Sequence, residues 1–174
     1  QAIVITDATT GTINFTVGLN DIVSEYVTGS SAITSDLGTI IGRDSNIPIT
    51  VNDSLSVGQG ELIANASTGN VQYQQGITDT LTNFSSSGSI TADFVAITGN
   101  DSNVNVTISD SSITGDNVIN LNAVADATNG IVTATISGNI VQLQDITTAI
   151  TDAITINVTD YVSTSQVNIL STKT

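Results

Sequence analysis

Apolar and polar residues alternate along several short segments of this chain, which is the pattern of strands with one buried face. One segment carries Ile47, Ile49 and Val51. The other alternating segments carry Val104, Val106, Ile108; Ile13, Phe15, Val17; Val71, Tyr73; Val132, Ala134, Ile136; and Ile154, Ile156, Val158. The alternation therefore predicts a series of short strands.

The hydrophobic period changes after several of these strands. An apolar series at the i, i+3, i+4, i+7 and i+8 spacing of one helix face is formed by Leu19, Ile22, Val23, Tyr26 and Val27. Similar series are Val118, Leu121, Val124, Ala125 and Ile140, Leu143, Ile146, Ile150. We therefore expect short helices between the strands, and strands separated by helices favour parallel pairing through crossovers.

An internal repeat organises these segments. Residues 42–54, "GRDSNIPITVNDS", recur as "GNDSNVNVTISDS" at residues 99–111, and "AITINVTD" at residues 153–160 is a shortened third copy. A second segment type alternates with the first, because residues 10–26 align with residues 68–84 and more loosely with residues 129–146. We expect one repeat-built domain over residues 1–174, with repeats at about 10–66, 67–127 and 128–174.

Units of a strand and a short helix predict an α/β fold, built as a solenoid or a layered parallel sheet. The alternative is an all-β sandwich, because Thr, Val and Ile are abundant and Gly58 and Gly60 weaken one helix. Residues 2–7, "AIVITD", are predicted as a separate N-terminal strand. Too few residues follow it for a crossover helix, so it would pair as a hairpin, act as a cap, or be donated to a neighbouring molecule.

Composition excludes several classes of function. The chain has 16 acidic and two basic residues, a net charge of −14, which argues against nucleic acids and anionic membrane surfaces as partners. It has no Cys, His, Met or Trp, which excludes disulfides, Cys/His zinc sites and His- or Cys-dependent catalysis. No apolar run is long enough to span a membrane. We expect that the protein is not an enzyme.

Clustered oxygen ligands in the repeated loops suggest calcium, which binds carboxylate and amide oxygens. The candidate ligands are Asp44, Asn46, Asp53, Asp101, Asn103 and Asp110. The alternative is architectural, because Asp and Asn also close turns and cap helices. The third copy has Thr151 and Ala153 where Asp44 and Asn46 stand in the first, which favours the architectural interpretation.

Glycans enter in two ways, as ligands of a flat face of strand Thr side chains such as Thr133 and Thr135, and as covalent modifications of Asn. Asn-x-Ser/Thr sequons occur at Asn14, Asn52, Asn65, Asn83, Asn100, Asn105 and Asn157. A chain this rich in Asn, Ser and Thr contains about that many sequons by chance, so glycosylation stays open.

Residues 49–84 resemble a tandem unit of very long bacterial repeat proteins, predicted surface or secreted proteins notably of cyanobacteria and proteobacteria. The matching parts are residues 49–53, 56–59, 67–71 and 77–81, and residues 124–146 resemble a neighbouring part of such units. The chain departs from the pattern in having Gly58 and Gly60 where Ala is usual. The resemblance implies an extracellular structural or adhesive role and brings no catalytic residues.

Three functional hypotheses follow. The first is a self-assembling structural repeat of a bacterial cell surface, as a surface-layer or large-adhesin segment. The second is a subunit of an extracellular filament or sheath assembled by strand exchange through residues 2–7. The third is a calcium- or glycan-binding module. In the first two hypotheses the main partner is another copy of the chain.

Overall fold

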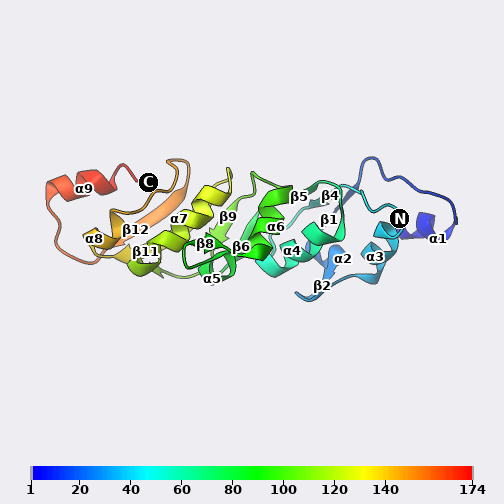
Figure 1. The fold of residues 1–174 in the computed structure, drawn as a ribbon, viewed down its shortest axis with the longest axis horizontal. Coiled ribbons are helices and arrows are strands. Elements are labelled where there is room, and N and C mark those ends of the chain that lie inside the picture. The colour runs from blue at the N-terminus through cyan, green and yellow to red at the C-terminus, as the bar shows by residue number, and fades with distance from the viewer. Residues whose placement is uncertain (1, 174) are drawn as a thin grey trace.

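The computed structural model describes residues 2–173, and the side chains of all of these except residues 3 and 7. The chain forms an elongated α/β rod, with its two termini near opposite ends (Figure 1). Successive strands pair in parallel through intervening helices, which confirms the predicted α/β solenoid-like fold and excludes the all-β sandwich.

Two parallel ladders run along the rod axis. The first contains β1 (Leu19–Asp21), β4 (Ile49–Val51) and β5 (Val71–Tyr73). The second contains β6 (Ile77–Asp79), β9 (Val106–Ile108), β11 (Val132–Gly138) and β12 (Ala153–Val158), with β10 (Ile113–Thr114) beside β11. A single parallel bridge between Leu55 and Ile77 joins them, so the coils form one continuous stack.

Helices connect the strands. The longer ones are α3 (Ser35–Ile41), α4 (Val57–Ala66), α6 (Ala92–Asn100), α7 (Val118–Ala127) and α9 (Thr164–Leu170). The shorter ones are α2 (Val23–Tyr26), α5 (Leu81–Phe84), α8 (Ile140–Leu143) and the 3₁₀ turn Gly115–Asn117. Two antiparallel hairpins join β2 (Val27–Thr28) to β3 (Ala32–Ile33) and β7 (Ser85–Ser86) to β8 (Ser89–Ile90). One hairpin therefore precedes each of the equivalent helices α3 and α6.

Local sequence starts the helices. Thr34 and Thr91 accept hydrogen bonds from backbone amides at the starts of α3 and α6. Reciprocal capping boxes start α4, α8 and α9, formed by Ser56 with Gln59, Asn139 with Gln142, and Ser163 with Gln166.

One apolar core lies between the strands and the helices along the rod. The inward side chains of the strands, such as Ile49, Val71 and Ile136, are fully buried. Phe84 and Phe94 meet edge to face with ring centroids 5.1 Å apart. The Tyr73 hydroxyl donates to the Gly60 carbonyl at 2.8 Å, which satisfies the one polar atom of that buried side chain.

The predicted N-terminal strand is wrong, because residues Ala2–Asp7 form a helix, α1, that packs on α3. The predicted strand around residues 13–17 is not formed either, and the expected helix face beginning at Leu19 starts as strand β1. All three differences lie at the N-terminal end of the rod. A short strand needs a ladder neighbour, and the structure places none beneath residues 2–17 within its described part.

Close packing between neighbouring coils requires glycine at position 69. A Cβ at Gly69 would lie 2.5 Å from the Asn46 and Ile47 carbonyl oxygens of the preceding coil. The equivalent Gly11, at the open end, has only the Thr9 hydroxyl within 4 Å, at 3.4 Å. We predict that Gly69→Ala lowers the free energy of unfolding by about 1–3 kcal/mol, whereas Gly11→Ala leaves it unchanged. Urea unfolding of both variants measures this, and equal losses would contradict the close approach.

Candidate functional site

Four aspartates lie at the end of a strand or just after it, and each accepts a hydrogen bond from the preceding coil. Every one accepts a hydrogen bond from the backbone amide of the first residue of a helix one coil earlier. The pairs are Val23 N to Asp53 Oδ1 at 2.6 Å, Val57 N to Asp79 Oδ2 at 3.1 Å, Leu81 N to Asp110 Oδ2 at 2.7 Å, and Ile140 N to Asp160 Oδ1 at 3.1 Å. We call these four residues the helix-capping aspartates.

The aspartates bind here because the first backbone amides of a helix need acceptors from outside the helix. The first amides of a helix have no acceptor within the helix, and the helix dipole favours a negative charge there. In α4 the Ser56 side chain serves the amide of Gln59, while Asp79 of the next coil serves the amide of Val57. The capping interaction is thereby also a connection between coils.

A second set precedes the strands. Phe15 N donates to Asp44 Oδ2 at 2.8 Å, Tyr73 N to Asp101 Oδ2 at 3.1 Å, and Val132 N to Asp152 Oδ1 at 2.8 Å. The other oxygen of each carboxylate accepts a local amide, from Asn46, Asn103 and Ala149 respectively. We call Asp44, Asp101 and Asp152 the strand-entry aspartates, because each holds the preceding coil where its own loop turns into a strand.

The six candidate calcium ligands are therefore separated into two positions. Asp44 and Asp53 flank opposite ends of β4, and Asp101 and Asp110 flank opposite ends of β9. The side chains of Asn46 and Asn103 are exposed, and each residue contributes its backbone amide. Among residues 2–173, no group of three or more acidic side chains is arranged to hold a metal ion. Calcium binding stays a prediction, and these hydrogen bonds favour the architectural alternative.

Three members of these sets, Asp79, Asp152 and Asp160, are not among the six candidate ligands, although Asp160 stands in register with Asp53 and Asp110 in the third copy. Asp79 aligns with Asp21 in the match between residues 10–26 and 68–84, so its position was visible but its partner was not. Asp152 lies one place from Thr151, which the ungapped alignment puts opposite Asp44. The signal that identifies the sets is the separation between donor and acceptor, which is 20 to 30 residues, or one coil.

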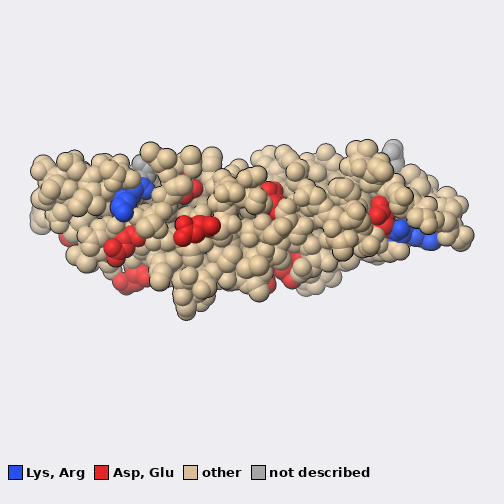
Figure 2. All heavy atoms as spheres, turned by 45° about the horizontal axis from the view of Figure 1, so that its top comes forward, with Lys and Arg blue, Asp and Glu red and all other residues tan. Residues whose placement is uncertain are grey.

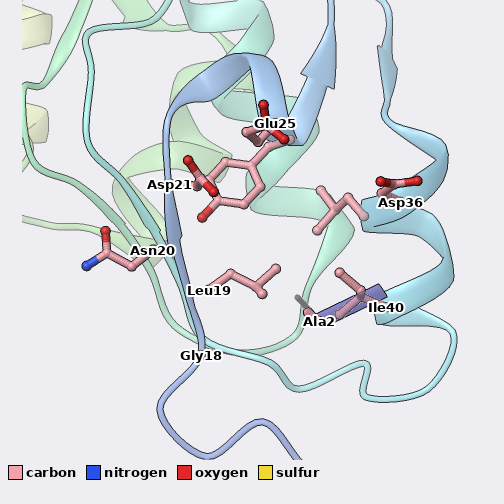
Figure 3. A pocket seen from close by; sticks show the side chains of 10 residues that line it. Ala2, Gly18, Leu19, Asn20, Asp21, Glu25, Asp36 and Ile40 are labelled. Atoms are coloured by element: carbon pink, nitrogen blue, oxygen red, sulfur yellow. The ribbon is translucent and has the colours of Figure 1, made fainter. Parts of the chain in front are cut away.

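A cleft of about 370 Å³ opens at the N-terminal end of the rod, between β1, α1, α2 and α3. Figure 3 shows Ala2 beside Ile40, with Asp36 on the same helix as Ile40 and the carboxyl groups of Asp21 and Glu25 across the cleft from Ala2. Burial raises the pKa of the adjacent Tyr26 phenol well above its ordinary value, and the Asp21 carboxylate raises it further. The protonated hydroxyl donates to the Thr50 carbonyl at 3.1 Å.

Comparison of the chain with protein families, characterised proteins and solved structures found no significant match. The resemblance to bacterial repeat proteins thus remains a prediction from the sequence. No helix within residues 2–173 combines the length and the apolar character that crossing a membrane requires.

The helix-capping role predicts a specific loss of stability. Asp110→Ala leaves the partly buried Leu81 amide without its acceptor and should lower the free energy of unfolding by about 1–2 kcal/mol. Asp110→Asn keeps an acceptor oxygen and should restore most of it. Asp126→Ala is the matched control, because the Asp126 side chain is exposed and makes no hydrogen bond to a described residue. Equal effects of Asp110→Ala and Asp126→Ala in denaturant titrations would contradict the role.

The architectural interpretation also predicts how the protein responds to calcium. Because backbone amides already occupy the carboxylates, we expect the same melting temperature in EDTA and in millimolar CaCl₂, and a flat calorimetric titration. MgCl₂ at the same ionic strength controls for screening of the net charge. A rise in melting temperature with Ca²⁺ but not with Mg²⁺ would establish a calcium site instead.

Proposed function

We propose that this chain is a structural module of a bacterial extracellular surface protein, of the surface-layer or large-adhesin kind, and that it serves as a stiff spacer. The observation that carries the proposal is the row of amide-to-aspartate hydrogen bonds that joins each coil to the next along the rod. A stack whose coils are connected both by strand pairing and by side chains resists bending and extension better than elements joined by loops alone.

The composition supports this role. Of the 16 acidic residues, 14 are Asp, and the short Asp side chain reaches a neighbouring backbone amide with little loss of rotamer freedom. Acidic side chains are spread along the visible face of the rod, whereas basic ones lie only near its two ends (Figure 2). A strongly negative surface favours solubility in an exposed setting and weakens unspecific contacts.

The second hypothesis, a filament subunit, required strand exchange through residues 2–7. Residues 2–7 form α1, so the donated strand that the hypothesis required is not available. Glycan binding remains a prediction from the sequence.

The location of the natural protein tests the proposal. We expect antibodies against this chain to label intact cells of the source bacterium, and brief external protease treatment to remove the label while a cytoplasmic marker is retained. Recovery of the protein only from the cytoplasmic fraction, with no label on intact cells, would contradict the proposed role.

A further inference from the structure

One peptide bond inside the rod joins an asparagine to a glycine, the pair of residues that is most prone to deamidation. Of the 17 asparagines in the chain, only Asn129 is followed by glycine. Because glycine has no side chain and a flexible backbone, its amide nitrogen can approach the side-chain carbonyl carbon of the preceding asparagine. The most reactive asparagine of the chain therefore lies in the loop between α7 and β11.

A threonine hydroxyl holds the backbone of this loop. Thr128 Oγ1 accepts a hydrogen bond from the Gly130 amide at 2.9 Å and donates to the Val104 carbonyl of the preceding coil at 2.7 Å. The Thr128 residue is buried. The Asn129 side chain is exposed and makes no hydrogen bond to a described residue. The carbon that would be attacked is therefore accessible, while the attacking nitrogen is held by its hydrogen bond.

Gly130 lies where no additional backbone atom fits. A Cβ on this residue would lie 2.3 Å from the Val104 carbonyl oxygen and 2.5 Å from the Asn103 carbonyl oxygen. On its N-terminal side the Asn129 amide donates to the Ser102 carbonyl at 2.8 Å, and on its C-terminal side β11 pairs with β9. The contact between the coils of β9 and β11 therefore depends on the length of the backbone at residues 129 and 130.

We propose that Asn129 is the deamidation site of this chain, that the Thr128 hydroxyl slows the reaction, and that the isoaspartate product loosens the contact between the coils of β9 and β11. The inference goes beyond the proposed structural role and does not rest on it, because the reaction needs only the folded chain and water. It determines how long the contact between these coils lasts after the protein has folded.

The reaction has two steps, with water and its hydroxide ion as the only co-reactants. In the first step the Gly130 amide nitrogen leaves the Thr128 hydroxyl, loses its proton to hydroxide and attacks Cγ of Asn129. A new C–N bond forms, the bond from Cγ to the side-chain nitrogen breaks, and that nitrogen takes up a proton and departs as ammonia. The product is a five-membered succinimide. In the second step water opens this ring, at Cγ to give aspartate or at the main-chain carbonyl to give isoaspartate.

The two products differ in what they change. Aspartate adds a charge to an exposed side chain, whereas isoaspartate routes the main chain through Cβ and so adds one backbone carbon before Gly130. This carbon would push Gly130 against the Val104 and Asn103 carbonyl oxygens, where even a Cβ does not fit. It would also displace the hydrogen bonds on either side of the turn. Isoaspartate should therefore loosen the contact between the two coils.

The equivalent turn of the preceding repeat has the same hydrogen bonds without the reactive residue. Ser67 Oγ accepts from the Gly69 amide at 2.9 Å and donates to the Ile47 carbonyl at 2.6 Å. Thr68 stands there in the place of Asn129. A threonine side chain has no carbonyl carbon, so this turn cannot form a succinimide. Asn129→Thr should therefore fold normally and remove the reaction.

Mass spectrometry of peptides from the purified chain, incubated in mildly alkaline buffer, measures the reaction at each asparagine. We expect Asn129 to react first, and a faster reaction elsewhere overturns the assignment of the site. Thr128→Val should raise the rate at Asn129 about threefold to tenfold, the factor that the net loss of one hydrogen bond implies. Thr128→Ser keeps the hydroxyl and should retain the original rate.

Ser67→Ala is the matched control for the role of Thr128. It removes the same two hydrogen bonds from the preceding repeat and should leave the rate at Asn129 unchanged. An unchanged rate in Thr128→Val, or an equal rise in Ser67→Ala, overturns the protection by Thr128. If Thr128→Val does not fold, the original chain in urea replaces it, and a rate at Asn129 in urea no higher than in native buffer overturns the protection.

The melting temperature tests the structural consequence. The chain with isoaspartate at residue 129, separated by chromatography from the aspartate form, should melt at least about 2–4 °C below the fresh chain. Asn129→Asp adds the charge without the backbone carbon and should melt close to the fresh chain, as should Asn129→Thr after the same incubation. An isoaspartate form that melts like Asn129→Asp contradicts the loosening of the coils. These measurements use the purified chain, so they and the surface-labelling experiment succeed or fail independently.

Discussion

The hydrogen bond from a backbone amide of one coil to an aspartate of the next is the interaction on which this rod depends. Helices as short as four residues, such as α2, α5 and α8, are not stable by themselves, because their first amides lack acceptors and they bury few side chains. The helix-capping aspartates supply those acceptors from outside. Each short helix is therefore stabilised by the coil that follows it, which makes neighbouring coils cooperative.

The aspartate side chain suits this role because it is short, polar and negatively charged. A carboxylate can accept two hydrogen bonds at once, as Asp79 does from Val57 and Thr80, and the strand-entry aspartates do the same at the other end of the strands. The four helix-capping and three strand-entry aspartates are seven of the 16 acidic residues, so the architecture accounts for nearly half of the acidic side chains.

Much of this arrangement was predictable from the sequence, and the failures have a common cause. Alternation identified β4, β5, β9, β11 and β12, each of which pairs with at least one neighbouring strand, and helical spacing identified α7. Residues 2–7 and 13–17 carry the same alternation but lie at the end of the stack, where no ladder neighbour is described. The hydrophobic pattern shows which secondary structure a segment favours, and the presence of a neighbouring coil determines whether that structure forms.

The candidate site was likewise predictable from the sequence only in part. The repetition of Asp44, Asp53, Asp101 and Asp110 was visible, but alternation and turn chemistry do not reveal a donor some 20 to 30 residues earlier in the chain. Once the length of a coil is known, the donor amide of each aspartate can be sought 20 to 30 residues earlier in the chain. Asp152 shows why an ungapped alignment is insufficient, since a shift of one residue conserves the hydrogen bond while it changes the aligned residue.

Amide hydrogen exchange tests the central claim most directly. The first amide of a helix ordinarily exchanges fast, because it has no acceptor within the helix. Here Val57, Leu81 and Ile140 should exchange slowly, because each donates to a helix-capping aspartate, while Thr164 in the open last coil should exchange fast. Exchange of the three amides as fast as that of Thr164, measured by NMR on the monomeric chain, would contradict the account.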